Sequence, residues 1–150
     1  MEYVDGVLVE RGESTIAHAL MQIVLSCHLE AYREQFQFEP LPGVRAQIVE
    51  GARYRIPDVM LCPLPVPAGI MTSVPWAVIE ILSPEDRFSD LVARFQDYKS
   101  IGVRHMVLLD PGDLVAYRFE KGALAQTQFT SLELPTGDLG HSIPKRCFGG

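Results

Sequence analysis

The sequence lacks several features that mark specialised classes of protein. It has no run of about 18 apolar residues, so no membrane-spanning helix is expected. Residues 1–15 are acidic and contain no apolar core of a secretory signal, so we expect a cytoplasmic protein. The three cysteines, Cys27, Cys62 and Cys147, are far apart and form no C-x-x-C zinc or redox signature. We expect all three to be reduced.

Positive charge is also scarce. Thirteen Lys and Arg residues face nineteen Asp and Glu residues, giving a formal net charge of -6. A protein that coats nucleic acid by charge alone needs a basic surface, so that class is excluded. The stretch from Arg45 to Arg104 nevertheless contains seven basic and seven acidic residues, so the acidic excess lies outside it. Local or metal-mediated contact with nucleic acid remains open.

The chain has enough apolar material for one globular core. Of its 150 residues, 47% are hydrophobic and 21% are charged, which is close to an average folded domain. We therefore expect a single domain over residues 1–150.

The first half of the chain reads as strands around one long helix. Residues 3–11 alternate loosely, with a turn at Asp5-Gly6. Residues 14–35 predict a helix with Ser14 as its N-cap. Its apolar residues at helical spacing are Ile16, Ala17, Leu20, Ile23, Val24 and Cys27. Strands are expected at 44–49 and at 54–62, the latter interrupted by Pro57. The proline-rich stretch 63–75 is expected to be a loop and a lid or wall of a site.

The second half predicts a strand–helix–strand unit followed by a hairpin. Residues 76–82 form a nearly continuous apolar run, which is typical of a strand buried on both faces. A helix over 89–101, with Ser89 as N-cap and Gly102 after its end, leads to a strand at 105–109. Strands at 114–119 and 124–130 predict a hairpin across Lys121-Gly122. The fold class is therefore α/β or α+β, a mixed sheet flanked by helices.

Two acidic residues interrupt otherwise apolar strands. Glu80 lies in the run 76–82, and Asp58 lies between Pro57 and Val59. A buried carboxylate costs several kcal/mol unless it is paired, protonated or bound to a metal. Mg²⁺ prefers such hard oxygen ligands. Pairing with arginine is an equally good interpretation, and the nearby candidates are Arg53, Arg55, Arg87 and Arg94.

A set of short motifs follows one family pattern. The motifs are Pro57-Asp58, Glu80-Ile81-Leu82-Ser83-Pro84, Asp90-Leu91, Arg94, Tyr98, Gly102-Val103 and Asp110-Pro111. With this combination, roughly residues 2–130 resemble the Uma-type family of restriction-endonuclease-like proteins. That family belongs to the PD-(D/E)XK nuclease superfamily.

The resemblance implies a DNA endonuclease that hydrolyses phosphodiester bonds and depends on Mg²⁺ or Mn²⁺. Asp58 and Glu80 would hold the metal, with the backbone carbonyl of Ile81 as a third ligand. The metal would polarise the phosphate and lower the pKa of the attacking water. Relatives in the superfamily are often homodimers, so a homodimer is expected.

The chain departs from the family at its basic residue. The superfamily lysine would stand at Leu82, and the helical lysine of Uma-type proteins would stand at Arg94. Arginine can clamp a phosphate but does not act as a general base, because it keeps its proton. A catalytically inactive nuclease-fold protein that binds nucleic acid or acts as an accessory is therefore the alternative.

Two further residues are candidates for the same site. The family usually has a histidine in its first helix, which implies that His18 contacts phosphate or water. A lone helical histidine is also commonly structural. Glu10 is a candidate for an additional acidic residue beside the metal and is otherwise a solvated side chain.

Overall fold

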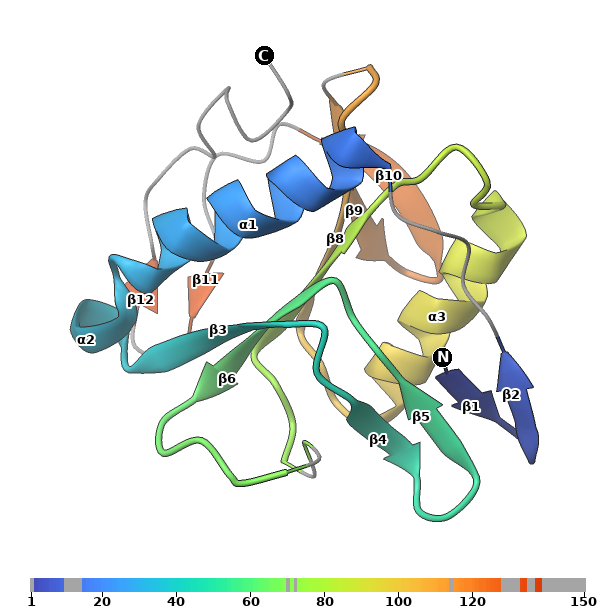
Figure 1. Cartoon of the computed structure of the whole chain (residues 1–150), viewed down its shortest axis with the longest axis horizontal. Helices are drawn as coiled ribbons and strands as arrows, with labels where there is room; N and C mark the ends of the chain where they lie inside the picture. Colours follow the sequence, from blue (N-terminus) through green and yellow to red (C-terminus); the bar gives the residue numbers. More distant parts are fainter. Residues whose placement is uncertain are drawn as a thin grey trace.

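The computed structural model describes residues 2–9, 15–69, 71, 73–113, 115–127, 133–134 and 137–138. Within these ranges the chain forms a six-stranded sheet, a four-stranded sheet and a two-stranded sheet, with few helices (Figure 1). The predicted α+β class with a mixed sheet flanked by helices is confirmed. No described helix is long and apolar enough to cross a membrane.

The six-stranded sheet has the order β10-β9-β8-β7-β6-β3. Its strands are β3 (Phe38–Pro42), β6 (Val59–Pro63), β7 (Ala77–Ile81), β8 (His105–Asp110), β9 (Val115–Glu120) and β10 (Ala123–Thr127). The strands β7 and β8 pair in parallel, and every other neighbouring pair is antiparallel. The helix α3 (Phe88–Ser100) connects the parallel pair, as the predicted strand–helix–strand unit requires.

The four-stranded sheet has the order β2-β1-β5-β4. Its strands are β1 (Glu2–Val4), β2 (Val7–Val9), β4 (Ala46–Val49) and β5 (Arg53–Arg55). The predicted turn at Asp5-Gly6 joins β1 to β2, and both residues have positive φ. The remaining short strands, β11 (Glu133–Leu134) and β12 (Gly137–Asp138), pair with each other.

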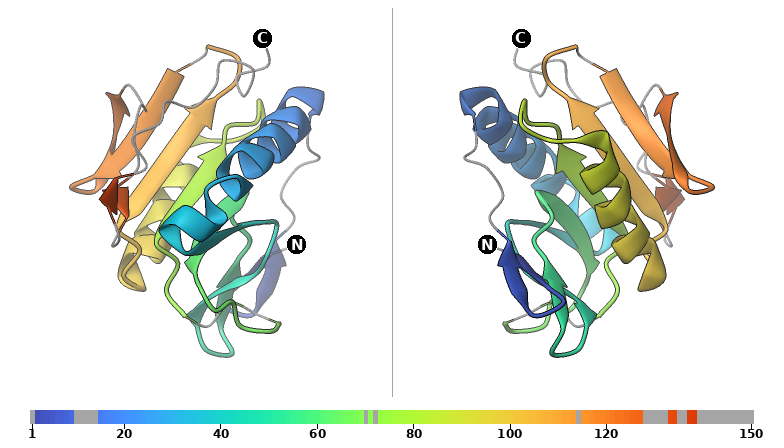
Figure 2. Two further views of the ribbon diagram at one scale, coloured as in Figure 1. Left: turned by 90° about the vertical axis from the view of Figure 1, so that its left-hand side faces the viewer. Right: turned by 90° about the vertical axis from the view of Figure 1, so that its right-hand side faces the viewer.

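Two apolar layers cover the faces of the large sheet. On one face α1 (Ile16–Glu30) packs Met21, Leu25 and Leu29 against the odd-numbered side chains of β7. On the other face α3 packs Leu91 and Phe95 against the even-numbered ones. The two helices therefore lie on opposite sides of the sheet (Figure 2). Because all five side chains of β7 are buried, its predicted burial on both faces is confirmed.

The first helix differs from its predicted bounds. Ser14 lies outside the described residues, and the N-cap is Thr15, whose Oγ1 accepts a hydrogen bond from the His18 backbone N–H at 3.1 Å. The helix ends at Glu30 rather than continuing to 35, and a separate turn of helix, α2 (Arg33–Phe36), follows. This break redirects the chain so that Phe36 and Phe38 both enter the core.

The outer apolar stripe of α1 does not face the core. The buried residues of the helix are His18, Met21, Leu25 and Leu29. Of the residues that predicted the helix, Ile16, Leu20 and Ile23 are 81%, 50% and 60% exposed, and Cys27 is exposed as well. The helix is thus apolar on two opposite faces, and only one of them packs against the sheet.

The start of α3 also differs from the prediction. Its N-cap is Arg87, without a side-chain capping bond, so Ser89 is not the cap. A hydrogen-bonded turn leads into the helix instead: the Ser83 N–H donates to Asp86 Oδ2 at 2.9 Å, and the Asp86 N–H donates to the Ser83 carbonyl at 3.0 Å. This turn precedes the helix, which begins at Phe88 and therefore includes Ser89 in its first turn.

The end of α3 is as predicted. Gly102 has φ +98°, its N–H donates to the Lys99 carbonyl, and the Val103 N–H donates to the Tyr98 carbonyl at 3.1 Å. These two bonds define a Schellman motif, which needs a residue with positive φ after the helix. The hairpin of β9 and β10 similarly turns through Lys121 and Gly122, both with positive φ.

We predict that Gly102→Ala lowers the free energy of unfolding by about 1–2 kcal/mol, because a Cβ disfavours the left-handed conformation. A Cβ at this position would meet only Val74 Cγ1 at 3.8 Å among its near neighbours, so the cost comes from the backbone and not from a clash. Gly102→Asn should cost less, since asparagine tolerates positive φ better. Urea unfolding of the three proteins measures this order, and an equal loss for Ala and Asn would contradict it.

Candidate functional site

Asp58 lies in the segment that leads from β5 of the four-stranded sheet to β6 of the six-stranded sheet. It follows Pro57 and precedes β6, so it is not inside the strand as the sequence suggested. Its Oδ2 accepts a hydrogen bond from the Ile81 N–H at 2.7 Å, and its own N–H points to Glu80 Oε1 at 3.3 Å. Each carboxylate is therefore tied to the backbone at or beside the other acidic residue. Asp58 is only 7% exposed.

His18 reaches Asp58 from the buried face of α1. Its Nε2 lies 3.1 Å from Asp58 Oδ1, so the proton of a neutral imidazole is on Nε2. Among the described residues, its buried Nδ1 has no hydrogen-bond partner. The neighbouring turn of the helix strengthens the contact, since Gln22 Nε2 donates to the Asp58 carbonyl at 2.8 Å.

Glu80 is fully buried on β7 and faces α3. Its Oε2 accepts a hydrogen bond from Arg94 Nε at 3.2 Å, and its Oε1 accepts one from the Tyr98 hydroxyl at 3.1 Å. The two acidic residues thus have different partners. Glu80 pairs with an arginine, as one interpretation of the sequence suggested, whereas Asp58 makes an ionic contact with His18.

Arg94 is a buried cation shared by several acceptors. Besides Glu80, its guanidinium contacts the Glu2 carboxylate, the Ile56 carbonyl at 3.1 Å and the Tyr98 hydroxyl at 3.2 Å. Burial alone would lower the pKa of Arg94, but the charges of Glu80 and Glu2 outweigh burial and raise it far above its usual value. Arg94 therefore stays charged and cannot serve as a general base.

Glu2 is a site residue that the sequence analysis missed. It is 4% exposed, its Oε1 accepts a hydrogen bond from the Ile56 N–H at 2.8 Å, and its Oε2 lies 3.2 Å from Arg55 NH1. The pairing of β1 with β5 brings it there. A carboxylate at the start of a short strand gives no local signal of burial, because its partners lie more than fifty residues away. The candidate Glu10 lies outside the described residues.

The arginines of β5 belong to the same ionic network. Arg53 NH1 and Arg55 Nε each bind the carboxylate of Asp97 on α3, at 2.7 and 2.8 Å. Arg53 also contacts Asp5 at 2.7 Å. These side chains fasten the small sheet to α3. Their charge is paired with carboxylates of the same chain, the nearly buried Asp97 and the exposed Asp5.

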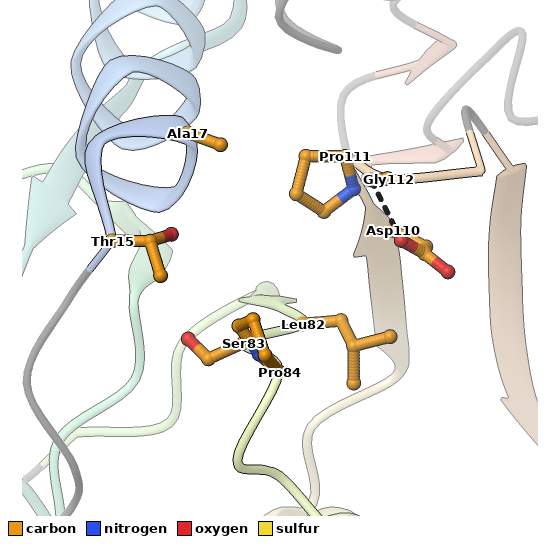
Figure 3. A pocket seen from close by; sticks show the side chains of 8 residues that line it. All are labelled: Thr15, Ala17, Leu82, Ser83, Pro84, Asp110, Pro111 and Gly112. Carbon is orange, nitrogen blue, oxygen red and sulfur yellow. Dashed lines mark hydrogen bonds between the residues drawn. The ribbon is translucent and has the colours of Figure 1, made fainter.

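The structure has a cavity of about 180 Å³, and Figure 3 shows the residues that line it. It lies where β7 and β8 end and α1 begins, and its lining includes Ala17 and Leu82, the chain neighbours of His18 and Ile81. The other lining residues are Thr15, Ser83, Pro84, Asp110, Pro111 and Gly112. The loop 63–75, predicted as a lid or wall, supplies none of them.

The donor set near Asp58 suits a hard divalent cation. Asp58 and Glu80 offer carboxylate oxygens, and Ile81 offers a backbone carbonyl next to both of them. Mg²⁺ sites in proteins typically use one or two carboxylates and complete their shell with water and phosphate. Within the described part of the chain, no three His, Cys, Asp or Glu side chains gather closely enough to hold a metal by themselves. Any such ion therefore needs oxygen ligands other than these side chains.

Comparisons with known proteins agree with this architecture. A family model described as "Uma2: Putative restriction endonuclease" matches residues 1–142. The chain resembles the crystal structure of a protein titled a "putative nuclease belonging to DUF820" from Anabaena variabilis. The TM-score is 0.80 and the identity 16%, covering 98% of this chain and 88% of the other. That identity shows the fold alone.

A second solved structure is more distant. It is the DrdV–DNA complex, with a TM-score of 0.44 and 11% identity over 74% of this chain and 12% of the other. A search of curated proteins finds no match.

We predict that Glu2→Gln lowers the free energy of unfolding by about 3 kcal/mol at pH 7, because it leaves Arg94 in a buried site with less compensating charge. Burial alone would raise the pKa of Glu2, but Arg94, the Ile56 N–H and Arg55 together lower it below its usual value of 4.5. The stability that ionised Glu2 contributes is therefore fully present above pH 4.5, and it is lost as the pH falls through the lower pKa of Glu2 in the folded state. The difference in free energy of unfolding between the wild type and Glu2→Gln should become smaller as the pH falls through that range.

Urea unfolding at pH 7, 5 and 3 tests both statements. Glu120→Gln is the matched control, since Glu120 is 57% exposed and pairs with Arg118 at 3.7 Å. It should change stability by less than about 0.5 kcal/mol. A loss for Glu2→Gln no larger than the control, or a gap that is constant with pH, would refute the role assigned to Glu2.

Proposed function

The chain belongs to the Uma2 family of restriction-endonuclease-like proteins, and from this premise we propose that it is a DNA endonuclease that depends on Mg²⁺ or Mn²⁺. One observation carries the proposal. The Asp58 carboxylate accepts the Ile81 N–H, and the Asp58 N–H points at the Glu80 carboxylate, so both acids converge on one end of β7. Two buried carboxylates held side by side are expected where a cation binds between them.

Asp58, Glu80 and the carbonyl of Ile81 would hold the metal in this proposal. When bound, a divalent ion supplies Lewis-acid polarisation of the phosphate and a more acidic water. The chain's own residues would then orient the metal-binding carboxylate and the water. His18 fixes the Asp58 carboxylate through Nε2, and its Nδ1 lone pair is an acceptor for a proton or a water hydrogen.

Arg94 has a different role from that of a catalytic lysine. Because its charge is permanent and is shared with Glu2 and Glu80, it pairs with the Glu80 carboxylate and fixes its orientation. It therefore supports the metal-binding carboxylate, and it offers no base for activating water.

A second function is favoured by Arg94 and by the burial of the side chains around it. Every side chain of the cluster is nearly buried, with Glu80 at 0%, Arg94 at 5% and Asp58 at 7% exposure. A phosphodiester reaches these groups only if the surrounding elements open. A nuclease-fold protein that binds nucleic acid or acts as an accessory without cleaving it is therefore the alternative proposal.

We predict that the wild type binds Mn²⁺ but cleaves supercoiled plasmid DNA weakly or not at all. Asp58→Asn should abolish Mn²⁺ binding measured by electron paramagnetic resonance, while keeping an acceptor for the Ile81 N–H. Asp90→Asn, the same change at an exposed acidic residue of α3, is the control and should leave binding unchanged. Mn²⁺ binding that is unaffected by Asp58→Asn would refute the metal site.

We further predict that Arg94→Lys increases cleavage at least tenfold if only a general base is missing, since such bases contribute about 10²–10⁴ in rate. A single ammonium group cannot replace all the contacts of the guanidinium, so Arg94→Lys is also tested together with Glu2→Gln, which removes the second carboxylate. The assay is plasmid nicking with Mg²⁺ or Mn²⁺, with EDTA and Asp58→Asn as blanks. Folded variants that bind Mn²⁺ and DNA without cleaving would favour the non-catalytic function.

A further inference from the structure

The pocket shown in Figure 3 lies at the carboxyl ends of the parallel strands β7 and β8. Leu82 directly follows β7, Asp110 is the last residue of β8, and Thr15 and Ala17 come from the start of α1. In open α/β sheets, ligands bind outside this edge of the strands. The metal site proposed above uses none of the residues that line the pocket, so the pocket has no assigned ligand.

The walls of the pocket are apolar, and its hydroxyl groups lie on one side. Ala17, Leu82 and Pro111 contribute carbon atoms, and the side chains of Thr15 and Ser83 contribute oxygens. Figure 3 shows these two oxygens on one side of the pocket and the Pro111 ring across from them. A hydroxyl both donates and accepts hydrogen bonds. This side can therefore bind the polar edge of a flat ring whose carbon atoms contact the apolar walls.

Hydrogen bonds hold the wall that follows β8 in place. Asp110 Oδ1 accepts the Gly112 N–H at 2.8 Å and the Asp113 N–H at 3.2 Å. Pro111, between Asp110 and Gly112, has a φ angle that its own ring fixes. The wall is therefore formed before a ligand binds, which lowers the entropic cost of binding.

The charge of the lining argues against the DNA backbone as the occupant. No Lys or Arg is among the described residues that line the pocket, and Asp110 adds a carboxylate. Phosphate groups bind where basic side chains replace their counterions. A nucleobase is neutral, with apolar faces and polar edges, so it matches both the apolar walls and the hydroxyls.

The volume of the pocket favours a base with one ring. An engineered protein cavity of about 150 Å³ binds benzene. A pocket of about 180 Å³ therefore accommodates one six-membered ring with its exocyclic oxygen or nitrogen atoms. A purine carries a second, fused ring that this pocket cannot enclose. We propose that the pocket binds an extruded pyrimidine base of a DNA strand.

This proposal rests on the proposed function and specifies its substrate. Ala17 and Leu82 are the chain neighbours of His18 and Ile81, and the Cα atoms of such neighbours are about 3.8 Å apart. A strand whose phosphate meets the Asp58 cluster can therefore place a nearby base in the pocket. A base must leave the helical stack to do so, which costs least in single-stranded or mispaired DNA. The preferred substrate is a strand with an unpaired pyrimidine.

Binding of strands that differ at one position tests the preference for a pyrimidine. Each probe is a short single strand of adenines whose central base is thymine, cytosine, adenine or absent. Fluorescence anisotropy with the full chain, in EDTA and in Ca²⁺, should show the two pyrimidine strands binding at least about fivefold more tightly than the others. Equal binding of all four strands would overturn the pocket proposal and leave a DNA-binding function intact. Binding of none would overturn both.

A matched pair of alanines on α1 tests whether the pocket causes the preference. Ala17→Leu fills the pocket, and Ala19→Leu is the control at an exposed position that does not line it. Leucine is nearly as good a helix former as alanine, so both variants should fold. Ala17→Leu should abolish the preference for a pyrimidine, and Ala19→Leu should retain it. A preference that survives Ala17→Leu, or that both variants lose equally, would overturn the proposal.

Free thymidine separates a base within DNA from a free nucleoside. In protein labelled at its alanine methyl groups, NMR should show the Ala17 signal shifting with the thymine strand while the Ala19 signal stays unchanged. Thymidine should need at least a tenfold higher concentration for the same shift, because the strand adds contacts outside the pocket. Thymidine that binds as tightly as the strand would overturn DNA as the source of the base. An Ala17 signal that the thymine strand does not shift would overturn the pocket as its binding place.

Discussion

The structure depends on one buried cation held between two carboxylates. Arg94 on α3 binds Glu80 on β7 and Glu2 on β1, so three elements from distant parts of the chain meet at a single guanidinium. Removing a charge from such a set is expensive, because the remaining charges cannot return to water. The interaction explains why the small N-terminal sheet lies against α3. It also explains how Glu80 can be fully buried on a central strand.

The Arg94 guanidinium also distinguishes this site from an open catalytic centre. Two carboxylates and a backbone carbonyl form a reasonable oxygen set for Mg²⁺, yet the guanidinium already occupies one side of Glu80. The cavity is lined by Ala17 and Leu82, which are the chain neighbours of His18 and Ile81, and by none of the cluster residues themselves. In the proposed function, a metal and a substrate would approach from the α1 side of the site, where Asp58 and His18 meet. Arg94 dominates the α3 side.

The sequence predicted most of the fold and part of the site, and the failures have physical causes. The strand–helix–strand unit around Glu80 was predictable because buried parallel strands are continuously apolar and Gly102 marks the end of a helix. The orientation of α1 was not, because the helix is apolar on two faces and periodicity cannot say which one meets the sheet. The cap of α3 was misassigned because the helix begins at Phe88, which places Ser89 inside its first turn.

The site residues were likewise predictable in part. Asp58 and Glu80 were recognisable because they interrupt apolar strands, and His18 and Arg94 followed from the family resemblance. Glu2 was not recognisable, because nothing in the residues around it distinguishes a buried carboxylate from a solvated one. Its role comes only from the pairing of β1 with β5, which places it beside Ile56 and Arg55.

The distance along the chain between Glu2 and Arg94 has a consequence for the order of folding. Glu2 leaves the ribosome about ninety residues before Arg94, its principal counter-charge. During synthesis, β1 can pair with β2 at once and with β5 later, and Glu2 can then meet Ile56 and Arg55, but it lacks Arg94 until α3 has been made. The N-terminal sheet therefore docks onto the rest of the protein late, and nascent chains that end before Arg94 should expose it to chaperones and proteases.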